Sequence, residues 1–223
     1  MKLHKIAAWL DKTLAVQSFD DVSNNGLQLA DPDADVAKAA FAVDASVRAV
    51  RAAAAKGAGL LVVHHGISWG GGIRRVSGGM YRVVKAAVEG GVAIYTCHLP
   101  LDAHAKYGNN FRLARYLGLK RLKRAFSYHG NIIGVTGYNA HGRKIGVCSG
   151  GAGEFAEEAK RLGCDLFVTG EASWGEKIAA ENAGIEMVCA GHYDTEVFGV
   201  RALCAAVRRG LGLETVDLTE ELR

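Results

Sequence analysis

The chain lacks the features that would take it into a membrane, out of the cell or onto nucleic acid. Its 223 residues begin MKLHKIAAWLDKTL, a stretch with a charge every few positions and no long apolar run, so neither a secretory signal nor a membrane anchor is predicted. Lysine and arginine outnumber aspartate and glutamate by only 27 to 23, and no five basic residues follow one another. We therefore expect a cytoplasmic protein whose partner is neither a membrane nor a nucleic acid.

Cysteine and proline are also scarce. The five cysteines form no C-x-x-C pair and mostly lie in apolar stretches, which predicts reduced, buried thiols and argues against disulfides or a zinc knuckle. Only two prolines, Pro32 and Pro100, interrupt the chain, and no Ser/Pro/Gly-rich linker is present. The hydrophobic fraction of 49% is typical of a globular protein with a substantial core.

Strand-like and helix-like patterns alternate along the chain. Apolar residues recur at helical spacing in some segments, whereas short continuous apolar runs elsewhere are typical of buried strands. The predicted strands are 39–45, 60–65 and 92–98, and the predicted helices are 3–16, 46–57 and about 79–89. Strands separated by helices of this length predict parallel β–α–β crossovers and hence an α/β fold.

The same order of elements occurs twice. Residues 144–176 repeat residues 40–71 element by element, and the S-W-G at 173–175 takes the place of the S-W-G at 68–70. GVAIYTCH (91–98) likewise matches GIEMVCAGH (184–192), and each ends in a histidine. This duplication predicts two similar, linked α/β domains with mostly parallel strands and flanking helices. We place the domains at 1–125 and 126–223, with a last helix that could pack back on the first domain.

Four of the eight histidines lie at the C-terminal ends of predicted strands: His64, His65, His98 and His192. The carboxyl ends of parallel strands form the edge of the sheet where ligands bind in open α/β folds. In an extended strand, the adjacent His64 and His65 point to opposite sides. They could therefore bind two different metal ions, or one of them could support a metal ligand without binding the metal itself.

Two carboxylates have matching positions, since Asp102 and Glu196 each lie four residues beyond a strand-end histidine. If a helix begins at His192, this spacing places His192 and Glu196 on one face, as in helical metal-binding pairs. Pro100 argues for a loop around Asp102. Imidazoles with carboxylates and no thiolate suit zinc, iron, manganese, cobalt or nickel, and a bridging carboxylate would allow two such ions. The alternative is that these side chains make ordinary hydrogen bonds.

Three further patterns are weaker. Gly151-x-Gly153-x-x-Ala156 resembles a dinucleotide fingerprint but lacks the acidic partner, so we interpret it as a strand-to-helix turn whose N–H groups could still hold a phosphate. SNNGLQLA (23–30) and YGNN (107–110) are typical of asparagine–glycine turns. Trp69 and Trp174 occupy equivalent places in the repeat, and packing is the favoured interpretation over stacking on a base.

Five stretches resemble one known family: DVSNNGLQL, GLLVVHHGISW, YTCHLPLDAHAKYGNN, DLFVTGEAS and GHYDTEVFGVRAL. In this order, and over nearly the whole chain, they are similar to the Nif-three-like dinuclear metal centre hexameric proteins, often named GTP cyclohydrolase one type two homologues. The resemblance implies two linked α/β domains with a two-metal site between them, in a toroidal homohexamer.

Matched motif by motif, the resemblance also implies roles for single residues. The implied metal ligands are His64, His65, Asp102, His192 and Glu196. Glu196 is the implied bridge, His98 serves proton transfer or supports the ligands, and Thr195 orients a ligand. Two departures from the family pattern are Gly66, where proline is common, and Leu99, where threonine is common. The chain is too short for the domain that longer members insert between the halves.

These observations favour a metal-dependent hydrolase that acts on a nucleotide or on another phosphate-bearing or heterocyclic small molecule. The alternative is a metal-binding or metal-delivery protein without turnover, and an interaction scaffold is favoured least because it leaves the histidines unexplained. Groups that hold an anion beside the metals would distinguish an enzyme from a carrier. Gly151 and Gly153 are the best candidates in the sequence.

Overall fold

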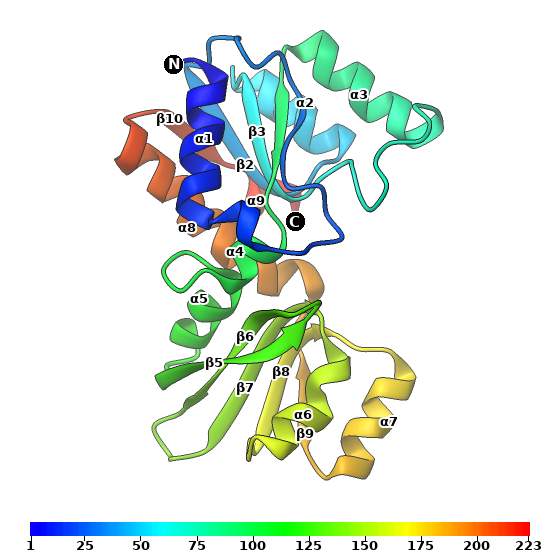
Figure 1. The fold of residues 1–223 in the computed structure, drawn as a ribbon, viewed down its shortest axis with the longest axis vertical. Coiled ribbons are helices and arrows are strands. Elements are labelled where there is room, and N and C mark those ends of the chain that lie inside the picture. Colours follow the sequence, from blue (N-terminus) through cyan, green and yellow to red (C-terminus); the bar gives the residue numbers. More distant parts are fainter. The chain divides into compact units, whose positions relative to one another are not determined.

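The computed structural model describes residues 1–223, and the chain forms two compact units (Figure 1). The first unit contains residues 1–101 and 200–223, and the second contains residues 102–199. Each unit has its own five-stranded sheet. The second unit therefore begins before the expected boundary at residue 125. It includes the whole of strand β5 (Lys120–Tyr128), which pairs antiparallel with β6 (Asn131–Tyr138).

The sheet of the first unit is mostly parallel, with the strand order β1-β4-β3-β2-β10. Only β1 runs antiparallel to its neighbour, β4. The strands are β1 (Gly26–Leu29), β2 (Lys38–Asp44), β3 (Leu60–His65), β4 (Ala93–Thr96) and β10 (Glu214–Asp217). The helices are α1 (Leu3–Leu14), a 3-10 turn at Val16–Ser18, α2 (Val47–Ala55), α3 (Gly78–Gly90) and α9 (Thr219–Leu222).

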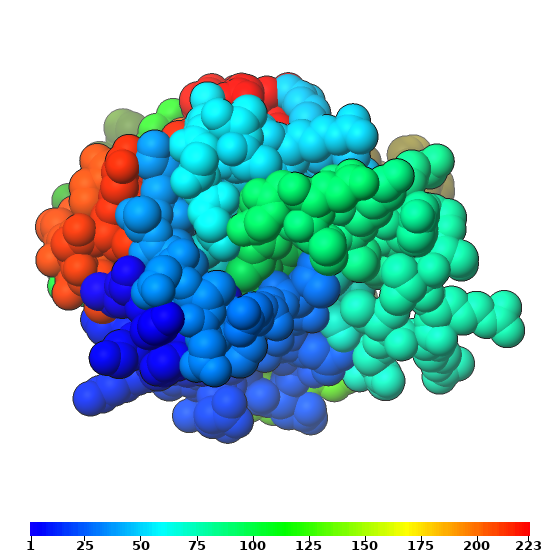
Figure 2. Space-filling model, turned by 90° about the horizontal axis from the view of Figure 1, so that it is seen from above, coloured from blue at the N-terminus to red at the C-terminus, as the bar shows by residue number.

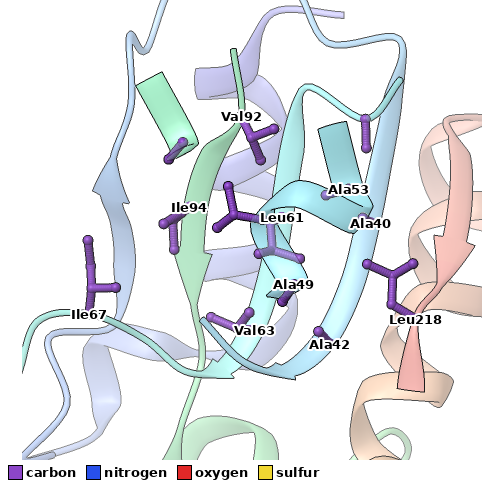
Figure 3. Packing of buried hydrophobic residues seen from close by; sticks show 13 residues of the cluster. Ala40, Ala42, Ala49, Ala53, Leu61, Val63, Ile67, Val92, Ile94 and Leu218 are labelled. Carbon is purple, nitrogen blue, oxygen red and sulfur yellow. The ribbon is translucent and has the colours of Figure 1, made fainter. Parts of the chain in front are cut away.

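Side chains that alternate along the strands build one layer of core on each face of this sheet. On one face, Leu61, Val63 and Ile94 pack with the alanines of β2 and α2, whose small side chains suit close packing of helix and sheet (Figure 3). On the other face, Tyr95 donates a hydrogen bond of 2.6 Å to Asp11 of α1. Both faces of β3 are thus buried, so the apolar run LLVV leads straight to the two histidines at the strand end.

The second unit has the strand order β5-β6-β7-β8-β9. Strands β7, β8 and β9 are parallel, and β5, β6 and β7 are antiparallel to one another in succession. The further strands are β7 (Lys144–Gly151), β8 (Leu166–Glu171) and β9 (Glu186–Cys189). The helices are α4 (Leu99–Ala103), α5 (Asn109–Tyr116), a 3-10 turn at Gly153–Phe155, α6 (Ala156–Arg161), α7 (Trp174–Ala183) and α8 (His192–Leu211). The chain passes between the units within α4 and within α8.

The repeat predicted from the sequence is confirmed by the topology. The order β2-α2-β3-α3-β4 in the first unit corresponds to β7-α6-β8-α7-β9 in the second, and in both sheets the middle strand lies between the other two. Parallel pairings make up five of the eight, as expected for an α/β fold with mostly parallel strands. None of the five cysteines forms a disulfide, and only Cys189 is exposed. None of the helices is both long and apolar enough to span a bilayer.

Candidate metal centre

Three histidine rings gather at the carboxyl edge of the first sheet. His64 and His65 end β3, and His98 follows β4, its parallel neighbour. The ring centroids lie 4.6 Å apart for His64 and His65, 5.1 Å for His64 and His98, and 5.7 Å for His65 and His98. One potential ligand atom from each ring falls within 4.8 Å of the others. The strand-end placement predicted from the sequence thus brings these three rings together.

His64 and His65 are held from neighbouring strands on either side of β3. The carbonyl oxygen of Cys97, just after β4, lies 3.0 Å from His64 Nδ1, and Asp44 Oδ1, at the end of β2, lies 2.9 Å from His65 Nδ1. Because these oxygens only accept, each Nδ1 carries a proton, which leaves Nε2 as the nitrogen that can offer a lone pair to a metal. The rings lie together and do not diverge, contrary to the expectation for a strand that stays extended.

His98 is held by Asp21, a residue that no sequence pattern marked as part of the site. Asp21 Oδ1 lies 2.8 Å from His98 Nδ1, and Asp21 Oδ2 accepts from Asn25 Nδ2 (2.8 Å) and from the N–H of Leu99 (2.9 Å). The Asp21 side chain is only 2% exposed. Burial alone would raise the pKa of Asp21, but the hydrogen bond and the charge of His98, with donation from Ser23 and Asn25, lower it to about 2.

The asparagines of residues 23–30 and 107–110 therefore support the site and do more than form turns. Asn25 accepts from the N–H of His98 (2.7 Å) in addition to its bond with Asp21. Asn109 Nδ2 donates to Asp102 Oδ1 (2.8 Å), and Asn110 Oδ1 accepts from the N–H of Ser149 (2.6 Å). A turn residue and a supporting residue have the same sequence signature, so only the contacts distinguish them.

A second group of ligand-type side chains begins helix α8 in the second unit. His192 is the first helical residue and Glu196 lies one turn later, with 3.2 Å between His192 Nε2 and Glu196 Oε1, as the four-residue spacing predicts. Glu171, at the end of β8, accepts from His192 Nδ1 at 2.9 Å. The hydrogen bond to Glu196 raises the pKa of His192 most, and burial opposes this increase. The negative charge of Glu196, together with the hydrogen bond to Glu171 and its charge, raises the pKa further, to about 9. Without metal, His192 is a cation at neutral pH.

Glycine allows the strand ends of the second unit to approach these side chains. A Cβ on Gly150 would lie 2.4 Å from Glu196 Oε1 and 3.3 Å from His192 Nε2, and Gly150 has φ +69°. A Cβ on Gly170 would lie 2.7 Å from Thr195 Oγ1. The Thr195 hydroxyl accepts from the N–H of Gly150 at 3.0 Å and is buried, so it fixes the strand end beside Glu196. This is where the structure places the residue expected to orient a ligand.

Asp102 lies in a short helix, although Pro100 led us to expect a loop. Pro100 stands in the first turn of α4 (Leu99–Ala103), where a helix needs no N–H from it and its fixed φ is suitable. Asp102 is 6% exposed, and its Oδ1 accepts from Asn109 and from Ser149 Oγ (3.3 Å). Ser149 immediately precedes Gly150, so Asp102 and Glu196 flank the same end of β7.

The turn at Gly151 and Gly153 shows little sign of a phosphate site. A hollow of about 410 Å³ beside it is lined by Gly151, Ala172, Ser173 and the carboxylates of Glu171 and Glu176, which repel an anion. A Cβ on Gly153 would lie 2.5 Å from that of Ala172, so close packing explains this glycine. The favoured interpretation, a strand-to-helix turn, fits these contacts.

The donor set fits divalent metal ions of borderline softness. In both units, each strand-end histidine has its Nδ1 held by a carbonyl or carboxylate oxygen, the arrangement that orients histidine ligands of metals and raises their basicity. Carboxylates stand beside the one imidazole of the second group, His192, and no cysteine belongs to either group. The clustered rings could therefore hold a metal ion.

Comparisons with known proteins agree with the motifs. The sequence model of Duf34/NIF3 (NGG1p interacting factor 3) matches residues 1–141 and again residues 120–221. Proteins named "GTP cyclohydrolase 1 type 2 homolog" from Archaeoglobus fulgidus and Pyrococcus horikoshii are 37% and 35% identical, with 98% and 97% of both chains covered. The crystal structure of TTHA1606 from Thermus thermophilus is 32% identical, with a TM-score of 0.84 over 98% of both chains.

Proposed function

Because the chain belongs to the Duf34/NIF3 family and orients its strand-end histidines as metal ligands are oriented, we propose that it binds two divalent metal ions and catalyses a metal-dependent hydrolysis. The proposed ligands are His64, His65, Asp102, His192 and Glu196. The observation that carries the proposal is the oxygen acceptor at each histidine Nδ1. An isolated structural histidine needs no such partner, and here every ligand candidate of this type has one.

When bound, a pair of divalent ions would supply an activated water and stabilise negative charge that develops on the substrate. His98 is the residue for proton transfer, because Asp21 fixes its Nδ1–H and leaves Nε2 to accept or release a proton. Glu196, whose carboxylate reaches His192 and is 3% exposed, is the proposed bridge between the ions. The names of the relatives favour GTP as the first substrate to test, within the wider class of nucleotides and other phosphate-bearing or heterocyclic small molecules.

The second candidate is a metal-binding or metal-delivery protein without turnover. The observation that favours it is the acidic lining beside the Gly151–Gly153 turn, where an enzyme for phosphorylated substrates would gain from groups that hold an anion. A carrier needs only the ligands and a route for exchange.

One experiment separates the two candidates. The protein is loaded in turn with zinc, manganese, iron(II), cobalt and nickel, its metal content is measured, and hydrolysis of GTP and of other nucleotides is followed. We expect two ions per chain and metal-dependent turnover, both reduced in Glu196→Ala and unchanged in Glu181→Ala, a carboxylate exposed on α7. Two ions per chain without turnover of any substrate would support the carrier, and fewer than one ion per chain in the unaltered protein would refute the metal centre itself.

We also propose that the protein acts in the cytoplasm as a homohexamer, on the basis of its resemblance to hexameric relatives. Sedimentation equilibrium would then give about six times the mass of the 23.6 kDa chain. A monomer or dimer at micromolar concentration would contradict this assembly.

A further inference from the structure

Trp69 stands directly beside the histidine cluster of the first unit. Its ring centroid lies 5.2 Å from that of His98, with the planes at 75°, and 6.0 Å from that of His65. The side chain nevertheless remains 39% exposed. The largest aromatic side chain near the three rings therefore belongs to a residue that remains partly open to solvent.

The position of this indole is fixed by its own segment. Trp69 Nε1 donates to the carbonyl of Gly66 at 3.1 Å, and Trp69 pairs with Ser23 in an isolated antiparallel bridge. Gln28 Oε1 accepts from the N–H groups of Ile67 (2.6 Å) and Ser68 (3.0 Å). The ring is thus held in place before any ligand arrives, which lowers the entropy lost when something stacks on it.

Gly66 is part of this arrangement. A Cβ at Gly66 would lie 2.0 Å from Thr96 Oγ1 and 2.2 Å from Gln28 Oε1, so a larger residue would displace the glutamine that holds the tryptophan segment. Glycine at this position therefore belongs with the way this chain positions Trp69.

Packing alone explains this tryptophan poorly. A core tryptophan is buried among apolar side chains, whereas Trp69 is partly exposed and faces imidazoles. Its indole N–H is already bonded to Gly66, so what remains available for recognition is the apolar face of the ring. Such a face binds flat, aromatic partners by stacking.

The segment that follows carries positive charge. Residues 70–78 stand out from the rim of the first unit in the turquoise part of Figure 2, and they contain the exposed Arg74 and Arg75 and no acidic residue. Gly70, Gly72 and Gly78 all have positive φ, between +51° and +89°. A ligand that combines a planar ring with negative charge matches an aromatic face followed by two arginines.

We propose that Trp69 forms a subsite for the planar ring of an anionic heterocyclic ligand, of which a purine nucleotide is the simplest example, beside the metal ligands. This inference rests on the proposed metal centre and narrows its substrate class. It favours ring-bearing nucleotides over phosphoesters without an aromatic ring, and it gives Trp69 a binding role in place of the packing role favoured from the sequence.

The test uses the metal-loaded protein and reads binding by tryptophan fluorescence and by calorimetry. Trp174→Phe removes the fluorescence of the equivalent tryptophan in the second unit, which is 77% exposed. Trp69→Phe measures the fluorescence that does not come from Trp69. We expect saturable quenching of Trp69 by GTP and by guanosine, and none by glycerol phosphate. Trp69→Leu, which keeps an apolar side chain without a ring, should bind GTP about tenfold more weakly, whereas Trp69→Phe should stay within a few-fold of wild type.

Failure of this inference and failure of the metal centre are distinguishable. If wild type and Trp69→Leu hold the same metal content and bind GTP equally, the ring subsite is refuted while the metal centre stands. If Trp69→Phe and Trp69→Leu both lose their metal, Trp69 acts as a support for the histidines, and the subsite is refuted as well. If the unaltered protein holds no metal, the proposed function fails first.

Discussion

Asp21 determines how His98 is oriented, and its buried carboxylate makes that role measurable. The pKa of about 2, below the ordinary 3.8, means that the ionised form is stabilised in the folded protein. This stabilisation is complete above pH 3.8 and is lost as the pH falls through about 2. Asp21→Asn should therefore lower the free energy of unfolding by about 2 kcal/mol at neutral pH, and the difference from wild type should shrink below about pH 4.

Urea unfolding of both proteins between pH 2 and pH 7 checks this prediction. Asp33→Asn is the control, because that side chain is 84% exposed. A difference for Asp21→Asn that stays constant down to pH 2 would contradict the ionic role of Asp21.

His192 gives the stability of the metal-free protein a pH dependence opposite in sign to that of Asp21, and it makes metal binding depend on pH as well. Its pKa of about 9, above the ordinary 6.5, stabilises the metal-free fold fully below pH 6.5, and this contribution is lost as the pH rises through about 9. A metal ion must displace the proton of His192, so the apparent affinity should rise by about tenfold per pH unit from this group and level off above about pH 9.

Competition with a chelator of known affinity, from pH 6.5 to pH 9.5, measures this slope. Glu171→Gln should move the plateau to lower pH, because it removes one of the two carboxylates that raise the pKa of His192. An affinity that does not change with pH would show that the metal does not displace a proton from His192.

At this scale, the strand-end histidines could be predicted from the sequence as candidate metal ligands, whereas Asp21, which holds His98, could not. A histidine after a strand is visible as a pattern, whereas the acceptor role of Asp21 depends on a loop 77 residues away in sequence from His98. Asp44 had a detectable signal, since it ends β2 in register with His65 on the neighbouring strand. Glu171 had a similar signal, because it ends β8 at the position that corresponds in the repeat to the double histidine at the end of β3.

Among the elements, the end of β7 depends most on a single residue. Gly150→Ala would place a methyl group 2.4 Å from Glu196 Oε1 at a backbone with φ +69°. Gly163→Ala is the matched control, because Gly163 has φ +75° and nothing within 4 Å of its Cβ position. We expect both changes to cost about 1–2 kcal/mol of backbone strain, and Gly150→Ala to cost about 1–3 kcal/mol more.

Thermal unfolding compares the two glycine variants, and metal analysis adds a second measurement. Gly150→Ala should also lose metal because Glu196 is displaced, whereas Gly163→Ala should keep it. Equal loss of stability in both variants would mean that the strand end adjusts without moving the carboxylate.

The parallel strands of the first repeat could be predicted because each is a buried apolar run between helical patterns. The match between the repeats extended that prediction to the second, including β9, which is mostly exposed. The hairpin of β5 and β6 was missed, since β5 begins with the charged and mostly exposed stretch KRLKR. Its omission placed the boundary at 125, after most of a strand that belongs to the second unit. The helix at Asp102 was missed because proline inside a helix and proline in its first turn look alike in sequence.

Across the whole molecule, duplication produced two equivalent strand ends with different chemistry. His65 at the end of β3 is a ligand candidate held by Asp44, whereas Glu171 at the end of β8 is itself an acceptor and holds His192. The ligand candidate of the second unit stands instead at the start of α8. The two halves thus present unlike ligand candidates on similar scaffolds.

Removal of metal should therefore lower the thermal stability of the whole chain. A ligand that binds only the folded state adds about 2.7 kcal/mol of stability at a concentration of 100 times its Kd, which corresponds to roughly 5–10 °C in Tm for a protein of this size. We expect EDTA to lower the Tm by this amount in wild type and to have little effect on His64→Ala or Glu196→Ala. His141→Ala, in the exposed turn between β6 and β7, should respond like wild type.

If the proposed ligands of both units serve one centre, the His64→Ala, Glu196→Ala double variant should lose no more of the metal-dependent stability than either single variant does. Additive losses would instead mean that each unit binds its metal independently, and the proposal of a shared pair of ions would fail.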